Sequence, residues 1–303
     1  MIKYLTDKGE VQMNSREILD IYRKNGINDI NVKTLIKVAF LQYKKDKNQF
    51  KKNTEYDFVP QNLIKLYYSK GSENSDFENI VLNFKKKYII QESKVENVHT
   101  KEEIEGLGIV YDYIRSDEWK KCPNIYIIMM INLKLFSLTP YPEAGGKIRN
   151  ANAYLKNSTA NLVPYNQIDT EIAKLYPKFQ EILQMGLALG SGIEKNEDKI
   201  LEYINKCLEL KCRLIEIHPF RDGNGRTMRA LTNLLFKLAN IPPIYVKLSE
   251  RDNYLKAMSY ALEEENYSQI REFYYYKICD SILELDVNDK INKEPTLIKI
   301  KSK

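Results

Sequence analysis

The sequence predicts an all-α protein, and three observations support this prediction. Apolar residues recur at helical spacing through most of the 303-residue chain. Two such segments flank a short turn near residue 220 that contains two glycines, which indicates helix, turn and helix. Thr100 and Glu103 form a capping box, the pattern that opens a helix. A chain of this length can bury a core and form one or two domains.

Composition narrows the class of protein. With 43% hydrophobic and 29% charged residues the chain is ordinary globular material. The net charge of +6 is mild and does not by itself indicate a nucleic-acid partner. Four cysteines without a C-x-x-C pair fit a reducing compartment, so we expect a cytoplasmic protein. No membrane partner is expected, because the longest apolar run, 125–136, is too short to span a bilayer and contains Lys134.

Residues 1–87 are predicted to form a small helical N-terminal region. Asn14 and Ser15 can cap a helix through Tyr22, and a second helix is expected over 32–43. A pair of short helices separated at Gly26 is also the arrangement of a helix-turn-helix DNA reader. A DNA-binding regulator is therefore an alternative of a different functional class.

The rest of the chain is predicted to be mostly helical. Helical spacing and start or stop signals predict helices over 77–93, 100–114, part of 118–136, 168–185, 199–217, 249–264 and 267–285. The prolines and paired glycines of 138–149 end the helix before them. Residues 286–303 are a polar, lysine-rich tail.

The turn near residue 220 has the chemistry of a phosphate site. Gly223 and Gly225 let the backbone approach a ligand closely, and the following helix presents free N–H groups at its N-terminus. Arg226 and Arg229 share one face of that first turn, and their guanidinium groups suit phosphate oxygens. Taken singly, these residues also fit a structural turn and a solvated face, and His218 fits a core histidine.

The run from His218 to Arg229, HPFRDGNGRTMR, resembles the full motif of the Fic family, H-x-F-x-[D/E]-G-N-G-R-x-x-R. All eight constrained positions occur in order. The resemblance implies a Fic helical core with a small β-hairpin flap over about residues 88–285. It also implies a protein adenylyltransferase, which transfers AMP from ATP to a hydroxyl group of a target protein.

The resemblance assigns a role to each motif residue. His218 would be the base that deprotonates the target hydroxyl, Asp222 would hold Mg²⁺, and Phe220 would pack the loop. The residues implied in binding the phosphates of ATP are Gly223, Asn224, Gly225, Arg226 and Arg229.

The segment 90–98 resembles the family's inhibitory helix, [S/T]-x-x-x-E-[G/N]. Its glutamate, here Glu96, would pair with Arg229 and take the place of the γ-phosphate, since a carboxylate resembles a phosphate oxygen to arginine. The match departs from the pattern at position 92, which is Glu where Ser or Thr is expected. Glu105, in the string Ile-Glu-Gly, is the alternative inhibitory residue.

Residues 140–164 occupy the place of the family's flap, the β-hairpin that clamps the backbone of the target. The flap start, implied in docking the target, is Gly146, Lys147, Ile148 and Arg149. Arg251 and Tyr254 stand where relatives often place a polar and aromatic pair near the nucleotide base, although both also fit an ordinary helix surface.

The expectation from sequence is therefore an adenylyltransferase that uses ATP and Mg²⁺ and is inhibited in cis by a glutamate. Its partner would be a protein with an acceptor Tyr, Ser or Thr, with self-modification and homo-oligomer formation left open. A different Fic chemistry is the main alternative: removal of AMP, or transfer of UMP, phosphocholine or phosphate.

Overall fold

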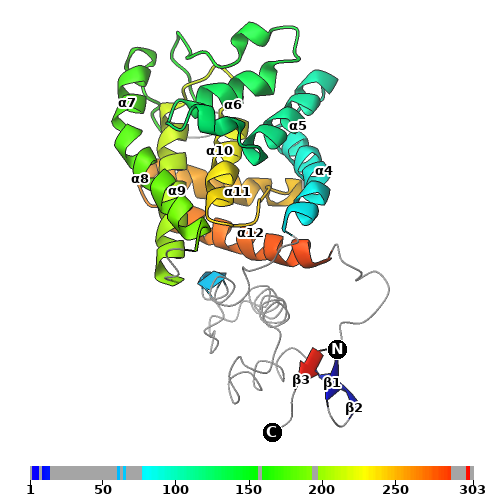
Figure 1. Cartoon of the computed structure of the whole chain (residues 1–303). Coiled ribbons are helices and arrows are strands. Elements are labelled where there is room, and N and C mark those ends of the chain that lie inside the picture. The colour runs from blue at the N-terminus through cyan, green and yellow to red at the C-terminus, as the bar shows by residue number, and fades with distance from the viewer. Residues whose placement is uncertain are drawn as a thin grey trace. The chain divides into compact units, whose positions relative to one another are not determined.

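A computed structural model describes residues 2–6, 9–13, 60–61, 64–65, 77–155, 159–192, 197–287 and 298–300. The chain divides into two compact units, residues 1–81 with 278–303, and residues 82–277 (Figure 1). The helices predicted before residue 60, and the DNA-binding alternative that depends on them, lie outside the described residues.

The first unit contains a three-stranded sheet with β1 (Ile2–Thr6) at its centre. Strand β2 (Gly9–Met13) pairs with β1 antiparallel, and β3 (Ile298–Ile300) pairs with it parallel. Sequence reasoning expected a helical region over 1–87 and a polar tail over 286–303, and predicted none of these strands. β3 comes from the opposite end of the chain, and a pairing of that kind leaves no local sequence pattern. In the register of the sheet, Lys3 is paired with Gln12, and Leu5 is paired with Glu10 on one side and Lys299 on the other.

The second unit is helical, and its α-helices lie close to the predicted ranges. They are α4 (Phe77–Val95), α5 (Lys101–Arg115), α6 (Ile127–Phe136), α7 (Ile168–Lys174), α8 (Tyr176–Gly190), α9 (Glu197–Ile217), α10 (Asn224–Leu238), α11 (Arg251–Glu263) and α12 (Ser268–Val287), of which α4 and α12 continue into the first unit. Single 3-10 turns lie between them, at Glu118–Lys121, Pro142–Ala144, Tyr165–Gln167 and Leu248–Glu250.

One predicted helix is interrupted, and the helix predicted within 118–136 begins at Ile127. The helix predicted over 168–185 divides into α7 and α8 at Leu175, because Pro177 stands in the first turn of α8 and begins a new helix there. The segment 118–136 forms a 3-10 turn before α6, and Pro123 lies between the two. None of the described helices has the length and apolar character needed to cross a bilayer.

Helix α10 is the centre of this unit (Figure 1). It packs against α5, α6, α8 and α9, and 13 of its 15 residues are buried. The apolar side chains of Leu231, Leu234 and Leu235 are nearly inaccessible and form part of the core. Arg226 and Arg229 are buried in the same helix, so both cations need partners within the protein.

The flap segment does not form the predicted hairpin in its described residues, 140–155 and 159–164. Its backbone has one β-bridge, between Ile148 and Phe220, and no ladder of paired strands. A 3-10 turn and left-handed Gly146 precede the bridge, so the chain turns before it reaches Phe220. One paired position stabilises far less than a full hairpin.

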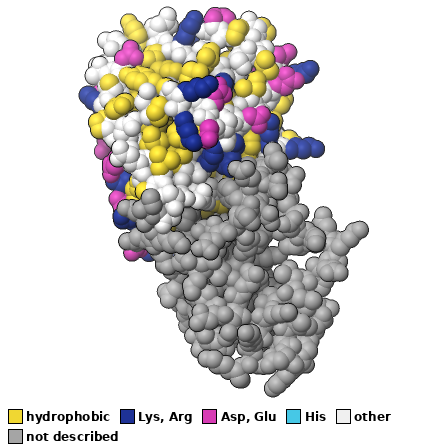
Figure 2. Space-filling model, viewed as in Figure 1, with side chains coloured by type: hydrophobic (Ala, Val, Ile, Leu, Met, Phe, Trp, Pro, Cys, Tyr) yellow, Lys and Arg dark blue, Asp and Glu magenta, His cyan; other side chains and the backbone are white. Residues whose placement is uncertain are grey.

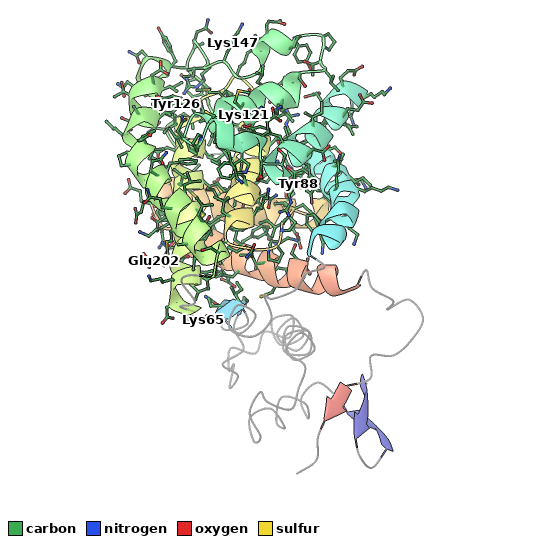
Figure 3. All side chains as sticks on the ribbon, in the orientation of Figure 1. Lys65, Tyr88, Lys121, Tyr126, Lys147 and Glu202 are labelled. Atoms are coloured by element: carbon green, nitrogen blue, oxygen red, sulfur yellow. The ribbon has the colours of Figure 1, made fainter. Side chains whose placement is uncertain are left out.

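Side-chain distribution separates core from surface. Figure 3 shows Lys147 at the outer end of the flap segment, and Tyr88 among the helices. Tyr88 is fully buried, with its ring 5.1 Å from that of Tyr111, which joins α4 to α5. On the face seen in Figure 2, hydrophobic side chains gather in patches between Lys, Arg, Asp and Glu side chains.

Candidate active site

The turn between α9 and α10 is held by Asn224. Its Oδ1 accepts the N–H of Phe220 at 3.0 Å, and its Nδ2 donates to the carbonyl of the same residue at 2.7 Å. Phe220 is fully buried and anchors the turn in the core. Gly223 has φ +75°, a left-handed conformation that suits glycine. The sequence assigned Asn224 to phosphate; here both ends of its amide bond the backbone of Phe220 and hold the turn. The first N–H groups of α10 lack helical partners and are candidate donors to an anion.

His218 follows the last residue of α9. Its Nδ1 lies 3.3 Å from the carbonyl oxygen of Ile215, which indicates that Nδ1 carries the proton and Nε2 has the free lone pair. Burial lowers the pKa of His218 below its ordinary value, and the positive charge of Arg149 acts in the same direction. A neutral imidazole with a free Nε2 has the chemistry of a proton acceptor.

Asp222 is the most exposed carboxylate of the site, with 69% of its side chain accessible. Its Oδ1 accepts the N–H of Gly223 at 2.6 Å, and its Oδ2 lies 3.3 Å from Arg226. Among the described residues, no cluster of three or more His, Cys, Asp or Glu side chains could hold a metal. Mg²⁺ usually binds one or two carboxylates together with substrate phosphates, so one exposed carboxylate beside an anion site fits this ion.

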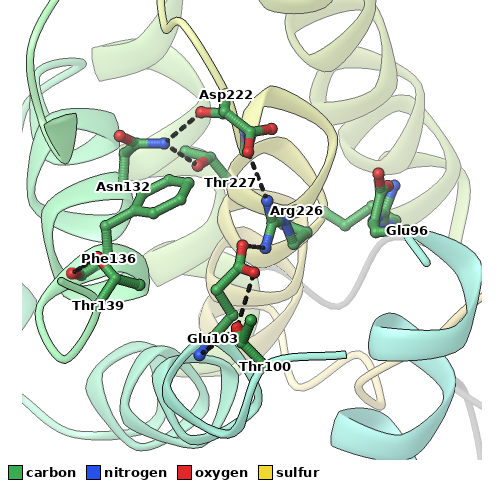
Figure 4. A network of polar contacts seen from close by, with 11 residues as sticks. Glu96, Thr100, Glu103, Asn132, Phe136, Thr139, Asp222, Arg226 and Thr227 are labelled. Atoms are coloured by element: carbon green, nitrogen blue, oxygen red, sulfur yellow. Dashed lines mark hydrogen bonds and ion pairs between the residues drawn. The ribbon is translucent and has the colours of Figure 1, made fainter. Parts of the chain in front are cut away.

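Arg226 is paired with two carboxylates from different parts of the chain (Figure 4). Its Nη1 lies 3.0 Å from Glu103 at the start of α5, and its Nη2 lies 3.3 Å from Asp222. The guanidinium also stands over the ring of Phe136 at 5.4 Å. Only 4% of the Arg226 side chain is exposed, so an incoming anion must compete with groups that already neutralise it.

Arg229 is enclosed by two carboxylates, one in α4 and one in the residue that follows it. Its Nε donates to Glu92 at 2.7 Å, and its Nη2 donates to Glu96 at 2.5 Å. Glu92 is fully buried, whereas 32% of the Glu96 side chain is exposed. The two glutamates are four residues apart and therefore share one face of the helix. Both carboxylates bind the same guanidinium, so the edge formed by Nε and Nη2 is fully occupied.

The pKa values follow this arrangement. Burial raises the pKa of Glu92, in spite of the neighbouring Arg229. For Glu96 burial acts in the same direction, but the charge and hydrogen bond of Arg229 outweigh it and hold the pKa below its ordinary value. Burial would lower the pKa of Arg229, but the two carboxylates keep it well above the ordinary value. Glu96 and Arg229 are thus a charged pair.

The Glu96 carboxylate lies at the N-terminus of α10. A Cβ added to Gly225 would stand 2.9 Å from Oε1 of Glu96 and 3.1 Å from Nη1 of Arg229. Glycine at this position therefore lets the carboxylate reach the first turn of the helix. Glu105, the alternative inhibitory residue, lies on the exposed side of α5, 3.7 Å from Lys101. Of the two candidates, Glu96 is the one that contacts Arg229.

The predicted flap residues lie in different environments. Gly146 donates its N–H to Oδ1 of Asn132 at 2.9 Å, Lys147 is exposed, and Ile148 forms the bridge to Phe220. Arg149 is only 6% exposed, and its guanidinium binds backbone carbonyls. Of the four residues 146–149, Lys147 is the charged one whose side chain faces solvent.

Arg251 and Tyr254 lie beside α4 and Arg229. The Nε of Arg251 donates to the carbonyl of Val95, the last residue of α4, at 2.8 Å. Tyr254 is 3% exposed, its ring stands 5.8 Å from the Arg229 guanidinium, and its hydroxyl accepts a hydrogen bond from Lys211. In this conformation the pair supports the glutamate-bearing helix and the arginine.

Sequence reasoning missed three residues of this site. Glu92 was noted only as a departure from the inhibitory pattern, although its spacing from Glu96 places it on the same helix face. Glu103 was read as part of the capping box alone. Asn132 left no signal, since a single Asn within an apolar helix has no pattern to distinguish it.

Comparison with known proteins agrees with this geometry. Residues 126–236 match the Fic/DOC family. The chain is 26% identical over 172 residues to a protein adenylyltransferase Fic of Nematostella vectensis, covering 56% of this chain and 36% of that protein. It is 30% identical over 122 residues to one of Drosophila grimshawi, covering 40% and 22%. The chain thus matches about a third or less of the length of these relatives.

Solved structures show the same fold. A Fic domain containing signaling protein from Bacteroides thetaiotaomicron superimposes with a TM-score of 0.59 at 15% identity, over 78% of this chain and 100% of that one. Fic-1 of C. elegans superimposes with a TM-score of 0.51 at 16% identity, over 92% and 79%. Residues 126–236 are thus similar to the Fic/DOC family, and the helical fold is the one seen in these solved Fic proteins.

Proposed function

We propose that this chain transfers AMP from ATP to a hydroxyl side chain of a target protein, and that Glu96 inhibits it in cis. The observation that carries the proposal is the contact of the Glu96 carboxylate with Arg229 at the N-terminus of α10. Helix α10 begins directly after the turn that contains His218. Relatives named protein adenylyltransferase support the reaction class.

His218 would act as the general base. Its Nε2 accepts the proton of the target hydroxyl as that oxygen attacks the α-phosphorus of ATP. The new O–P bond forms while the bond between the α-phosphorus and pyrophosphate breaks, and pyrophosphate leaves with the electron pair. The carbonyl of Ile215 keeps the proton on Nδ1 and so keeps Nε2 free. A positioned base typically contributes roughly 10²–10⁴-fold to the rate.

Phosphate binding would use the N-terminus of α10 and its two arginines. Backbone N–H groups and guanidinium donors at a helix N-terminus bind anions together. Asp222 would hold Mg²⁺, which when bound supplies positive charge that stabilises the phosphates. Most of the catalysis would come from positioning and charge stabilisation, because phosphoryl transfer needs little covalent participation by the protein.

Inhibition would follow from competition for Arg229. The guanidinium is buried and already binds two carboxylates, so the outer phosphate of ATP must displace at least the Glu96 contact. Glu96 is suited to displacement because its side chain is partly exposed and lies at the end of α4, where Asn97 turns the chain with φ +56°. A partner or a second copy that shifts this helix end would activate the site.

The test uses ATP labelled at the α-phosphate, with Mg²⁺, and scores self-labelling and labelling of a cell lysate. Wild type, Glu96→Gly, Glu105→Gly and Glu96→Gly with His218→Ala are compared. Glu105→Gly is the matched control, because it makes the same change at an exposed position of the next helix. We expect label with Glu96→Gly alone.

Each other outcome identifies what is wrong. Label with Glu105→Gly but not with Glu96→Gly would reassign the inhibitory residue. Labelling that persists in the protein with His218→Ala would show that His218 is not the general base. Transfer of a γ-phosphate label in place of an α-phosphate label would indicate phosphorylation, and loss of AMP from a modified substrate would indicate AMP removal.

A further inference from the structure

Arg149 is a buried cation that gathers backbone carbonyls around the catalytic turn. Its side chain was expected to dock a target but is only 6% exposed. The hydrogen bonds that its side chain donates are Nε to His218 O at 2.8 Å, Nη1 to Ala151 O at 2.7 Å, Nη2 to Ile217 O at 3.3 Å, and Nη2 to Val163 O. All four acceptors are backbone carbonyls.

These carbonyls come from three segments that must stay together. Ile217 ends α9, so the last carbonyls of that helix lack helical partners. A cation at this position also interacts favourably with the negative end of the helix dipole. Ala151 lies within the flap segment and Val163 near its C-terminal end. The backbone N–H of Arg149 adds a further bond, to the carbonyl of Pro219 at 2.8 Å. One residue thus joins the helix end, the catalytic turn and both sides of the flap.

His218 needs such support because its backbone is strained. Its φ is +50°, in the left-handed region that a residue with a Cβ seldom adopts. Conformations of this kind cost roughly 1–3 kcal/mol and persist only where the surroundings hold them. Leu214 holds the N–H of His218 through its carbonyl at 3.0 Å, and Arg149 holds the carbonyl of His218.

The same guanidinium acts on the imidazole. The influences on the His218 ring are burial, the hydrogen bond to Ile215, the positive charge of Arg149 and the negative charge of Asp222. Burial and Arg149 favour the neutral ring, and the other two favour the protonated ring. Arg149 is therefore the cation that counters Asp222.

We propose that Arg149 is a positioning residue for His218, which fixes the backbone of the catalytic turn and keeps the imidazole in its proton-accepting form. The proposal rests on the proposed function in taking His218 as the base. It also couples the flap to the base, because a displacement of Ala151 or Val163 would move the Arg149 side chain that binds the carbonyl of His218.

The test combines a ring titration with kinetics on the full chain. His99 and His218 are the two histidines of the protein, and His99 lies on an exposed loop, so NMR titration of the rings has an internal reference. Arg149→Met is compared with Arg149→Lys, and Arg221→Met is the titration control, because it removes the same charge from an exposed side chain near His218. Mg²⁺ is left out of the titration.

We expect Arg149→Met to raise the titration midpoint of His218 by roughly half a unit or more, while His99 and the Arg221→Met protein are unchanged. In the Glu96→Gly background, Arg149→Met should lower kcat by about tenfold or more with little change in KM for ATP. Arg149→Lys keeps the charge but loses the fork, so its midpoint should stay near wild type while kcat falls. It carries the test if the Met variant does not fold.

The proposal would be overturned if either folded variant had the His218 titration midpoint of its parent together with a kcat within about twofold of the parent's. A fall in kcat in both variants with an unchanged midpoint in Arg149→Met would reduce Arg149 to a structural role and also count against it. Absence of any labelling by Glu96→Gly would sink the proposed function instead, and the titration would still decide whether Arg149 controls the ring.

Discussion

Glu92 and Arg229 form an ion pair in which the carboxylate is fully inaccessible to solvent and binds the Nε of the guanidinium at 2.7 Å. Glu96 binds the same guanidinium at Nη2. The inhibitory pattern expects Ser or Thr at position 92, so this chain has a second carboxylate where the pattern has a neutral hydroxyl. Arg229 therefore keeps a carboxyl partner even when Glu96 is displaced.

Glu92→Gln, made in the Glu96→Gly background, should increase the affinity for ATP by roughly tenfold. Two unit charges about 7 Å apart repel by about 2 kcal/mol at an effective dielectric constant near 20, and Gln keeps an acceptor for the Nε of Arg229 without the charge. Calorimetric titration with a non-hydrolysable ATP analogue would measure the change. Weaker binding in the double variant would show that Glu92 orients Arg229 and does not oppose the phosphates.

The Glu96–Arg229 pair should make stability depend on pH in the acid range. Because the pKa of Glu96 is held below its ordinary value of 4.5 by Arg229, its contribution is present above that pH. The contribution is lost as the pH falls through the lower pKa of the folded protein. Urea unfolding from pH 7 to pH 3 should show a gap between wild type and Glu96→Gln that narrows below about pH 4.5. A gap that stays constant across this range would contradict a charged pair.

Glu103 has two partners, and they can be separated by mutation. Thr100 accepts the N–H of Glu103 at the start of α5, and its hydroxyl donates to the Glu103 carboxylate at 2.9 Å, for which Gln keeps an acceptor oxygen. The carboxylate itself lies 3.0 Å from Arg226. Glu103→Gln in the Glu96→Gly background should therefore strengthen ATP binding several-fold with little loss of stability. Its matched control is Glu102→Gln, which removes a carboxylate from the same helical turn.

Equal affinity in the Glu103→Gln and Glu102→Gln proteins would show that Arg226 does not bind phosphate. A large fall in melting temperature with Glu103→Gln alone would show that the carboxylate is needed for packing between α5 and α10. Circular dichroism on the same samples separates these two outcomes.

Local signals in the sequence predicted the helices of the second unit and the turn between α9 and α10. The capping box at Thr100 begins α5, and the run from His218 to Arg229 lies at the junction of α9 and α10. Helical spacing reports which face of a segment is buried, and a glycine-containing turn reports where the chain reverses. Both features depend only on residues close together in the chain, which explains why sequence reasoning found them.

Features that depend on distant residues were missed. Arg149 looked like an exposed flap residue because its carbonyl partners at His218 and Ile217 lie about 70 residues away. The contact of Asn224 is local, since its amide bonds the backbone of Phe220 four residues away, but nothing in the motif reveals it. Hydrogen bonds from side chains to backbone carbonyls are common, but a sequence does not reveal them, because every residue offers the same acceptor.

Asn132 is the residue whose loss should damage the site most without touching a ligand. It is fully buried, its Nδ2 donates to the carbonyl of Asp222 and to Thr227, both at 3.1 Å, and its Oδ1 accepts the N–H of Gly146 (Figure 4). It thus links α6 to the anion turn, to α10 and to the start of the flap. No other described side chain in this network joins all three.

Asn132→Leu should lower the free energy of unfolding by about 2–4 kcal/mol, since each buried polar group left without a partner costs roughly 1–3 kcal/mol. The matched control is Asn233→Leu, because Asn233 is also buried and holds the backbone of Ile244 with both ends of its amide. Both variants should lose similar stability in urea unfolding. Only Asn132→Leu, in the Glu96→Gly background, should also lose about tenfold or more in the rate of labelling at a temperature where both proteins remain folded. Equal labelling rates would show that the anion turn holds its geometry without Asn132, and that its three hydrogen bonds serve stability alone.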